Sequence, residues 1–574
     1  MAKQNINIDN IRHSLAHLLA AAVLQQFPKA KLGIGPVIEN GFYYDFLLPR
    51  SLTPDDLKRF EATMRQFIKD RLSFSGKKVT VVQAKNQFKG QRFKLDLIKE
   101  FSKDKKPLTV YKTGNVFLDL CRGGHVKNTS EINPDAFKLD KIAGAYWRGN
   151  EKNPQLQRIY GLAFETKKEL DEYSAMMEEA KKRDHKKLGQ ELDLFTFSEL
   201  VGSGLPLWTP KGTIIRNLLD DFVWLLRKER GYQKVEIPHI TKKDLYEISG
   251  HWAKFNNELF KIVTREGHLF AMKPMNCPHH TQIYKRRLWS YRDLPQRYAN
   301  TTMCYRDEQT GELAGLSRAR SFTQDDAHVF CRQDQIIEEM DKIWEIIKKF
   351  YTAVGFDDLE IRLSLHDPKQ LEKYLGTSKL WKLMEGQLRG LVKKRGVKAV
   401  EAVGEAAFYG PKIDFLAKDS LRREWQVATI QLDMNLPERF DLTCVNEGGK
   451  PERIVMIHAA IMGSIERFLS IVIEHYAGAL PFWLAPVQVK IIPIADRHLD
   501  YAQEVAKSLV DFRVEIANES ETVGKKIRNA ELQKIPYLLV VGDVERDNKT
   551  IRARERQGGD LGEMSVEDFI KKVK

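Results

Sequence analysis

The chain has 574 residues and a mass of 66.4 kDa, several times a typical domain of roughly 100–200 residues, so we expect three or four domains. Its composition, 42% hydrophobic and 30% charged, is typical of a globular protein with large cores. The sequence has neither an apolar run of roughly 18 residues nor a signal-peptide core at its start, which predicts a cytoplasmic protein without membrane spans. Five scattered cysteines exclude a disulfide framework.

The net charge of +15 is concentrated at the front of the chain. Residues 1–190 carry 35 Lys and Arg against 22 Asp and Glu, whereas residues 485–574 carry 16 of each. This distribution predicts a polyanionic partner that contacts mainly the front third. The alternative is a lysine-rich surface that is merely solvated.

Residues 11–27 are expected to form an amphipathic helix, followed by a glycine-punctuated turn and strand. His13 and His17, four residues apart, share one face of that helix. About a hundred residues later, Cys121 and His125 recur at the same spacing, around two glycines that permit a tight loop. These four side chains could be a metal site, a second active site or packing.

Residues 165–190 have apolar positions at helical spacing with dense charge between them, which predicts a long solvated linker helix after a separate first module. A second helix is expected from about Thr213 to Arg230, stopped by Gly231 and followed by a short strand ending at Pro238. In the last ninety residues, β-rich runs alternate with helical stretches. That alternation predicts a small α/β domain with a largely parallel sheet.

The middle of the chain contains the strongest chemical signal. In "MCYRDEQTGELAGLSRARSFTQDDAHVF", Arg306 and Glu308 precede a turn, and Arg318 and Arg320 lead into a strand-like segment. Paired arginines on strands beside a short loop can bind phosphate oxygens without a glycine-rich phosphate loop. Later, "IMGSIERFLSIVIEHY" places Arg467 in the first turns of an apolar helix. These strings resemble the second and third signature motifs of the class II aminoacyl-tRNA synthetases, and the unit ending at Pro238 is similar to the first.

Cys277, His328 and His458 are each the obvious soft metal ligand of their segment. One thiolate and two imidazoles make a three-ligand zinc site with an open fourth position, although a buried cysteine more often only packs. The surrounding strings "MNCP", "RDE", "FTQDDAH", "FYGPKIDF" and "GSIERF" occur in the order found in the threonyl-tRNA synthetases. The chain closely resembles that family over nearly its whole length.

The resemblance implies an α+β multidomain protein. It implies an α+β editing domain (1–164), the linker helix (165–190), a class II catalytic domain with an antiparallel sheet flanked by helices (191–484), and an α/β anticodon-binding domain (485–574). Such an enzyme activates L-threonine with ATP and Mg²⁺ and transfers it to tRNA(Thr). One Zn²⁺ per subunit and a homodimer, formed through the first-motif helix and strand, are also implied.

The resemblance assigns roles to residues of the catalytic domain. Arg306 is expected at the α-phosphate, Arg467 at the γ-phosphate and Glu308 at the adenine region, with Arg318 as a further catalytic residue. Asp326 is expected to accept a hydrogen bond from the threonine hydroxyl, which valine lacks. The remaining expected pocket residues are Met275, Gln324, Tyr409, Lys412, Gln426 and Gln431.

The zinc site is not expected to exclude serine, because serine has the same zinc-binding groups and only one methyl group less. That methyl group changes the binding free energy by only ~1–3 kcal/mol. A second, editing site is therefore expected. His13, His17, Cys121 and His125 match the family's editing signature, which implies hydrolysis of seryl-tRNA(Thr) without metal; a zinc site is the alternative reading. Further editing residues expected from the resemblance are Tyr44, Lys94 and Asp119.

At the C-terminal end, Glu545, Arg552 and Arg554 fall where the family reads anticodon bases. The editing signature begins at His13, so the ubiquitin-like domain that precedes it in many bacterial members is expected to be absent. Ala314 stands where the second-motif loop usually has a histidine. Two other classes of protein were considered: a synthetase-like regulatory or RNA-binding paralogue, and a free-standing zinc hydrolase. The first would be expected to lose the phosphate arginines or zinc ligands, and the second leaves the centre of the chain unexplained.

Overall fold

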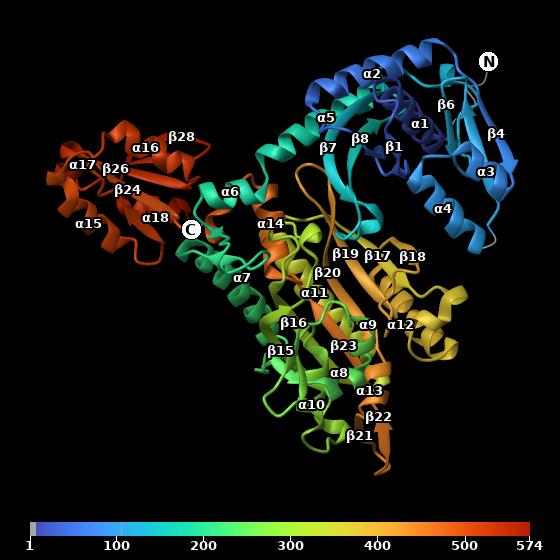
Figure 1. Ribbon diagram of the computed structural model, residues 1–574. Helices are drawn as coiled ribbons and strands as arrows, with labels where there is room; N and C mark the ends of the chain where they lie inside the picture. Colours follow the sequence, from blue (N-terminus) through green and yellow to red (C-terminus); the bar gives the residue numbers. More distant parts are fainter. Residues whose placement is uncertain (1–6, 105, 574) are drawn as a thin grey trace. The chain divides into compact units, whose positions relative to one another are not determined.

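The structure is a computed structural model that describes residues 7–104 and 106–573 (Figure 1). The chain divides into two compact units, residues 1–179 and 180–574, each with its own hydrophobic core. The division falls within helix α5 (Lys167–Lys182), inside the segment predicted to link the first module to the rest.

The first unit is built around helix α1 (Ile8–Gln26), which begins after Asn7, whose side chain accepts a hydrogen bond from the Asp9 N–H. Every residue from Ser14 to Val23 is buried. The amphipathic helix predicted for residues 11–27 was thus right in position but wrong in character. Alanine and leucine occupy most positions from Leu15 to Val23, and a helix that is apolar nearly all round belongs inside a core.

Besides most of α5, the first unit contains two antiparallel sheets and the helices α2, α3 and α4. One sheet has the strand order β1-β3-β8-β7, with β2 paired to β3, and the other has the order β4-β5-β6. Helix α2 packs beside α1 in the main core. The strands are β1 (Lys31–Leu32), β2 (Val37–Ile38), β3 (Gly41–Leu47), β4 (Phe74–Val79), β5 (Leu108–Thr113), β6 (Phe117–Leu120), β7 (Phe137–Tyr146) and β8 (Gln155–Ala163), and the helices are α2 (Pro54–Lys69), α3 (Val81–Gln87) and α4 (Arg92–Lys103).

The segment predicted as one long linker helix contains two helices, α5 and α6 (His185–Glu191). The prediction of a single helix was wrong because Asp184 starts a new one. Its backbone has left the helical conformation, and its side chain accepts a hydrogen bond from the Lys186 N–H at 2.7 Å. Aspartate is among the preferred residues at this capping position.

The second unit contains an eight-stranded sheet of order β11-β15-β16-β23-β20-β19-β17-β18. Only the outermost pairs, β11 with β15 and β17 with β18, are parallel, so the predicted antiparallel catalytic sheet is confirmed. In Figure 1, green β16 and orange β23 lie side by side although they are far apart in the sequence. The strands are β11 (Gln233–Lys234), β15 (Gln296–Tyr305), β16 (Ser321–Cys331), β17 (Leu359–Leu365), β18 (Ala399–Val403), β19 (Lys412–Lys418), β20 (Glu424–Asp433) and β23 (Val455–Ala460).

Helices pack against this sheet and form the largest core with it. Helix α7 (Pro210–Lys228) begins at the Thr209 cap, close to the predicted helix, and the strand expected after it is the two-residue β11. The other long helices are α10 (Cys277–Lys285), α11 (Ile336–Val354), α12 (Ser378–Arg395) and α14 (Ile465–His475). Smaller elements are α8 (Lys243–Ser249), α9 (His251–Lys254), α13 (Asn435–Arg439), β9 (Phe195–Thr196), β10 (Leu207–Trp208), β12 (Ile240–Lys242), β13 (Lys261–Val263), β14 (Leu269–Met272), β21 (Thr443–Val445) and β22 (Pro451–Arg453).

The C-terminal part has a five-stranded sheet of order β25-β24-β26-β27-β28. The first three strands are parallel, but β27 and β28 form an antiparallel hairpin, so the prediction of a largely parallel sheet was only partly right. Gly559, at φ +74°, lies where that hairpin turns back. The elements are β24 (Val489–Pro493), β25 (Val514–Ile516), β26 (Tyr537–Val541), β27 (Ile551–Glu555), β28 (Gly559–Met564), α15 (Leu499–Ser508), α16 (Val523–Leu532), α17 (Asp543–Asn548) and α18 (Val566–Val573).

Candidate active sites

The three predicted zinc ligands come together in the catalytic sheet. His328 on β16 and His458 on β23 are directly opposed cross-strand partners, and His328 Nε2 lies 3.1 Å from His458 Nδ1. Cys277 is the first residue of α10. One donor atom from each of the three residues lies within 4.8 Å of the others, and all three side chains are buried. The register of β16 and β23, together with the start of α10, thus brings together three residues that are far apart in the sequence.

Two further residues contact the ring nitrogens of His328 and His458 that do not face each other. His280 Nδ1 lies 2.7 Å from His328 Nδ1, and Asp433 Oδ2 lies 3.0 Å from His458 Nε2. Metal-bound imidazoles generally have such a partner on their other nitrogen, which fixes ring orientation. Neither residue was predicted from the sequence, although they lie in "NCPHH" and "QLD", beside predicted residues. The donor set and its outer partners fit zinc.

Burial is the main cause of the shifted pKa values of two of the three predicted zinc ligands. It raises the pKa of the Cys277 thiol well above its usual value and lowers the pKa of His328 well below its usual value. A bound cation favours the thiolate, which is the ligand form of cysteine.

A cavity of about 710 Å³ lies on the same face of the sheet. Gln324 lines the cavity, and Asp326 and His328 follow at alternate positions of β16, which point to one face of a strand. Ala460 lines the cavity as well and is two residues from His458 on β23. The metal cluster and the cavity are therefore neighbouring parts of one site.

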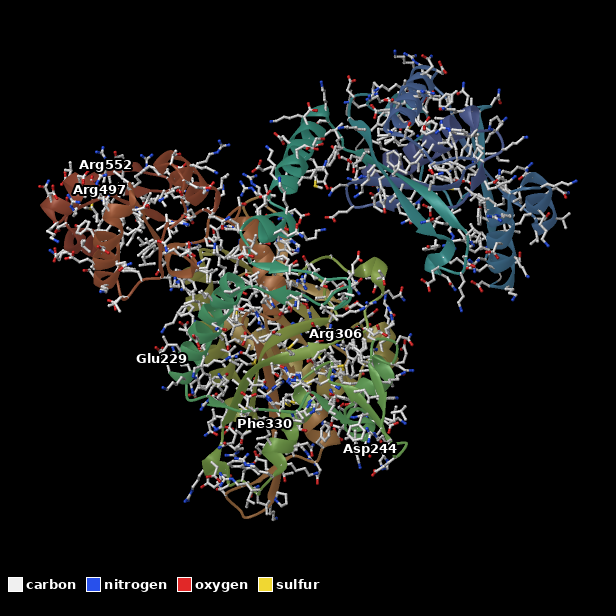
Figure 2. The ribbon with its side chains drawn as sticks, turned by 60° about the vertical axis from the view of Figure 1, so that its left-hand side comes forward. Glu229, Asp244, Arg306, Phe330, Arg497 and Arg552 are labelled. Atoms are coloured by element: carbon white, nitrogen blue, oxygen red, sulfur yellow. The ribbon has the colours of Figure 1, made fainter. Side chains whose placement is uncertain are left out.

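Arg306, at the end of β15, brings an unpaired positive charge to the cavity (Figure 2). Its guanidinium lies 5.1 Å from the centre of the Phe322 ring and 3.2 Å from the Met275 sulfur, which are both weak partners. Its Nε is buried without a hydrogen-bond partner. Arg467 lines the cavity from the first turn of α14, where Ser464 Oγ accepts its backbone N–H. Among the residues that the structure describes, neither arginine forms an ion pair, so both can bind an anion.

Glu308 and Arg318 face the same cavity but neutralise each other. Arg318 NH2 lies 2.7 Å from Glu308 Oε2 and 3.1 Å from Glu312 Oε2. Arg318 is therefore less available for an anion than Arg306 or Arg467.

The other predicted substrate residues divide into two groups. The Tyr409 hydroxyl donates to Gln431 Oε1 at 2.9 Å, and the Tyr409 ring stacks on His458 with centroids 5.1 Å apart, so both adjoin the metal cluster. Lys412 Nζ and Gln426 Nε2 instead bond the same carboxylate, that of Asp414, at 2.8 and 2.6 Å. Asp414 was not predicted.

Asp326 lies between the cavity and the metal cluster. Burial raises its pKa to about 6. Its Oδ2 accepts a hydrogen bond from Asn276 Nδ2 at 3.2 Å, and Asn276 was also not predicted. Near pH 7 this carboxylate is mostly ionised and can accept a hydrogen bond from a hydroxyl group.

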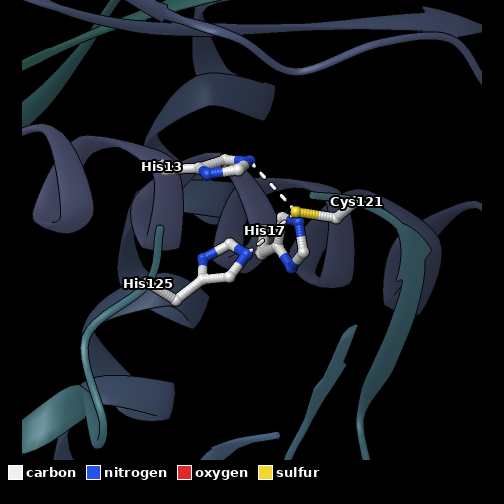
Figure 3. Close-up of side chains that lie close together, drawn as sticks. All are labelled: His13, His17, Cys121 and His125. Carbon is white, nitrogen blue, oxygen red and sulfur yellow. Dashed lines mark hydrogen bonds between the residues drawn. The ribbon is translucent and has the colours of Figure 1, made fainter. Parts of the chain in front are cut away.

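The first unit gathers the other predicted cluster, shown in Figure 3. Cys121 Sγ lies 3.5 Å from His13 Nε2 and 3.2 Å from His125 Nε2. His17 contacts His125 with ring centroids 4.2 Å apart, and its Nδ1 is buried without a partner. Gly123 and Gly124, at φ +98° and +83°, allow the tight loop that was predicted. All four residues have a potential metal donor atom within 4.8 Å of the others, so the geometry by itself accommodates either water or a metal ion.

The remaining predicted residues of this cluster form a buried network. Lys94 Nζ lies 2.6 Å from Asp119 Oδ1, and the Tyr44 hydroxyl donates to Asp119 Oδ2 at 2.5 Å. Lys94, Asp119, His13 and Cys121 line a cavity of about 360 Å³. The network therefore adjoins the space in which a substrate could bind.

Burial sets the protonation of the cluster near pH 7. It lowers the pKa of His13 and, much further, that of His17, and it lowers the pKa of His125 to about 2. It raises the pKa of Cys121 to about 11. Three neutral imidazoles and a protonated thiol can orient water and exchange protons with it.

The three predicted anticodon residues lie on α17 and β27. The Glu545 carboxylate is buried and accepts the Gly542 N–H at 2.9 Å, so it caps α17 instead of facing solvent. Arg552, labelled in Figure 2, is exposed and lies 2.6 Å from Asp560 Oδ2. Arg554 is half-buried on the same strand.

Three stretches of the chain match family models. Residues 260–476 match the tRNA synthetase class II core domain (G, H, P, S and T), and residues 488–574 match the anticodon binding domain. Residues 108–160 match the threonyl and alanyl tRNA synthetase second additional domain. The protein is therefore a class II aminoacyl-tRNA synthetase with an additional domain that is associated with editing of mischarged tRNA.

Comparison with whole proteins narrows the class. The threonine–tRNA ligase of Gloeobacter violaceus is 48% identical over 98% of this chain and 91% of the relative, and that of Porphyromonas gingivalis is 47% identical over 98% and 86%. The chain belongs to the threonine–tRNA ligase family. A solved structure titled as the RNA binding domain of the Cryptosporidium parvum threonyl-tRNA synthetase matches with a TM-score of 0.64 and 37% identity, over 68% of this chain and 97% of that one. In the described part of the chain, no helix has the length and apolarity needed to span a membrane.

Proposed function

We propose that this chain, as a threonine–tRNA ligase, activates L-threonine with ATP in the 710 Å³ cavity and transfers the threonyl group to the 3′ end of tRNA(Thr). The observation that carries this proposal is the cross-strand pair His328 and His458, completed by Cys277, on the sheet face that the cavity shares. Amino-acid recognition and phosphate binding are thereby adjacent. The reaction then depends on positioning and electrostatic stabilisation, without a protein nucleophile.

The two unpaired arginines are suited to the triphosphate. Arg306 binds the α-phosphate, where negative charge develops during attack by the threonine carboxylate, and Arg467 binds the γ-phosphate. Glu308, held by Arg318, contacts the adenine region. Mg²⁺ enters with ATP and neutralises further phosphate charge.

Threonine binds beside the cysteine and the two histidines. Cys277, His328 and His458 would hold one Zn²⁺, which would supply a Lewis acid for the amino and hydroxyl groups of threonine. Asp326 accepts a hydrogen bond from the hydroxyl. Valine leaves that acceptor unpaired, which a polar site can reject by several powers of ten. Tyr409 and Gln431 enclose this end of the pocket, and Gln324, Lys412, Gln426 and Met275 enclose the side toward ATP.

The first unit removes serine from mischarged tRNA(Thr). The 360 Å³ cavity bordered by His13, Cys121 and the Lys94–Asp119 pair receives the seryl ester. The neutral histidines and the thiol orient a water molecule and stabilise the developing oxyanion without a metal ion. The excess of basic residues in 1–190 supports contact with the tRNA acceptor end.

Arg552 and Arg554 read anticodon bases, while Glu545 shapes the start of α17 beside them. The active form is a cytoplasmic homodimer that pairs through α7 and β11. Leu225 on α7 is about half exposed and is available for a contact with a second copy.

The test is ATP–pyrophosphate exchange with threonine, serine and valine on protein of measured zinc content. Threonine-dependent exchange, weak exchange with serine and none with valine are expected. Deacylation of seryl-tRNA(Thr) by the wild type and by His13→Ala tests the second site, and hydrolysis should be lost in the variant. Absence of exchange from zinc-loaded protein contradicts the proposal and favours a non-catalytic paralogue.

A further inference from the structure

Outside the catalytic residues, one histidine contacts both the loop that lines the ATP cavity and the helix that contains Arg467. His185, the buried first residue of α6, has Nδ1 at 2.7 Å from Glu474 Oε1 and Nε2 at 3.1 Å from the Leu316 backbone nitrogen. A backbone amide can only donate, so Nε2 accepts and Nδ1 carries the proton. The ring is thus a neutral tautomer with each nitrogen in a defined role. Neither nitrogen is left for a metal ion, although Asp184, His185 and Glu474 could otherwise be considered a ligand group.

Glu474 anchors the ring on one side. It lies in the last turn of α14, the helix whose first turn contains Arg467. Its Oε1 also accepts the His185 backbone N–H at 3.2 Å, and its Oε2 accepts from Arg423 NH2 at 2.6 Å. Burial acts to raise the pKa of Glu474, but the hydrogen bonds from His185 and Arg423 outweigh it and lower the pKa. The carboxylate is therefore an ionised and fully bonded anchor.

The loop between β15 and β16 lies on the other side. Leu316, Ser317 and Arg318 of this loop line the ATP cavity. The approach is close: a Cβ atom on Gly315, which has φ +60°, would lie 2.4 Å from His185 Nε2. The Leu316 N–H bond to His185 thus fixes the loop directly before Arg318, whose partner is Glu308.

We propose that His185 is a positioning residue for ATP, which holds the Leu316–Arg318 segment in register with α14 and so sets Arg318 and Glu308 relative to Arg467. The proposal rests on the ATP-binding roles proposed above. His185 itself touches no substrate. Its Nε2 contact serves the nucleotide end of the pocket alone, because Asp326, Tyr409 and Gln431 at the threonine end make no contact with it among the described interactions.

Two substitutions separate the two contacts of the ring. His185→Gln places an amide oxygen near Nε2, which keeps an acceptor for Leu316 and loses the bond to Glu474. His185→Asn places an amide nitrogen near Nδ1, which keeps the donor to Glu474 and loses the bond to Leu316. If the ring only fastens α6 to α14, the glutamine variant is the defective one. If the ring positions the loop, the asparagine variant is the defective one.

The experiment measures ATP–pyrophosphate exchange of the full-length variants with ATP and threonine varied separately, together with the thermal midpoint. We expect His185→Asn to raise the KM for ATP about tenfold, since the Leu316 amide is left buried and unpaired, with the KM for threonine unchanged. His185→Gln should stay within about twofold of the wild type for ATP. The reverse order, equal loss for both substrates, or two variants like the wild type would overturn the proposal. Absence of exchange by the wild type overturns the proposed function instead, and equilibrium dialysis of labelled ATP against the same variants then still tests His185.

Discussion

His328 and His458 occupy directly opposed positions of the antiparallel strands β16 and β23, with His328 Nε2 3.1 Å from His458 Nδ1. Each ring is held from the far side, one by His280 and the other by Asp433. Two imidazole nitrogens that face each other at hydrogen-bond distance in a buried site are well arranged for a cation between them and Cys277. The strand register therefore places the two histidines for metal binding before any ligand is present.

Cys277→Ser should remove zinc and activity together, because serine supplies no soft anionic ligand. We expect metal content to fall from about one zinc per chain to a small fraction, and threonine-dependent exchange to fall by at least about 100-fold, because the site loses its main contact to threonine. Cys444→Ser, at another buried cysteine outside the cluster, is the control. Elemental analysis and exchange rates check both, and a fully zinc-loaded Cys277→Ser protein would contradict the assignment.

Asp326→Ala should weaken discrimination between threonine and valine. The variant removes the acceptor for the threonine hydroxyl, so we expect kcat/KM for threonine to fall by about 10–100-fold while the trace reaction with valine changes little. Exchange rates with the two amino acids give the ratio. Gln296→Ala, at the far end of neighbouring strand β15, is the control and should leave the ratio unchanged. A ratio like that of the wild type in Asp326→Ala would exclude the proposed role.

Much of this site could be predicted because its ligands lie in short strings with a characteristic order. Cys277 and His458 are far apart in sequence, yet each lies in a recognisable segment. Their partners act through tertiary contacts, His280 from helix α10 and Asp433 from strand β20, which no local pattern encodes. The same holds for His185, whose role depends on Glu474 almost three hundred residues away.

The bounds, burial and direction of helices and strands were less predictable where the local sequence is compatible with more than one structure. Helical periodicity continues through Asp184, and only its capping bond to Lys186 breaks the helix. Periodicity also predicted the helix that contains His13, but it did not predict that the helix is buried on all sides. That burial depends on the sheets and helices packed around it. In the C-terminal sheet, apolar runs predict strands but not their direction: β27 runs antiparallel to β26, and the turn before Gly559 reverses the chain again into β28.

Lys94→Met should destabilise the first unit strongly. Lys94 and Asp119 form a buried ion pair, 2% and 3% exposed, and removal of the cation leaves an unpaired buried carboxylate. We expect the free energy of unfolding of this unit to fall by ~3–5 kcal/mol. Lys58→Met, at an exposed pair on α2 of the same unit, should change it by less than ~0.5 kcal/mol. Thermal or denaturant unfolding of the full chain checks the contrast, and similar effects of the two substitutions would refute it.

Arg552→Ala should affect tRNA without affecting amino-acid activation. Its pair with Asp560 is exposed, so the fold should be little changed, but loss of a base contact should raise the KM for tRNA(Thr) about tenfold. Exchange with ATP and threonine needs no tRNA and should be unchanged. Arg528→Ala, exposed on α16, is the control. Equal effects of both variants on tRNA would indicate general electrostatic attraction instead of base recognition.

Seryl-tRNA(Thr) hydrolysis should be nearly independent of pH between about 6 and 9, the range around the ordinary histidine pKa of about 6.5. Burial lowers the pKa values of His13, His17 and His125, so their neutral forms persist as the pH falls through 6.5. At the alkaline end, the Cys121 thiol stays protonated because its pKa is raised to about 11. Single-turnover deacylation at constant ionic strength measures the profile. A rate that halves near pH 6.5 would place the reacting imidazole in contact with solvent, and loss of activity on chelation would reinstate a metal-dependent site.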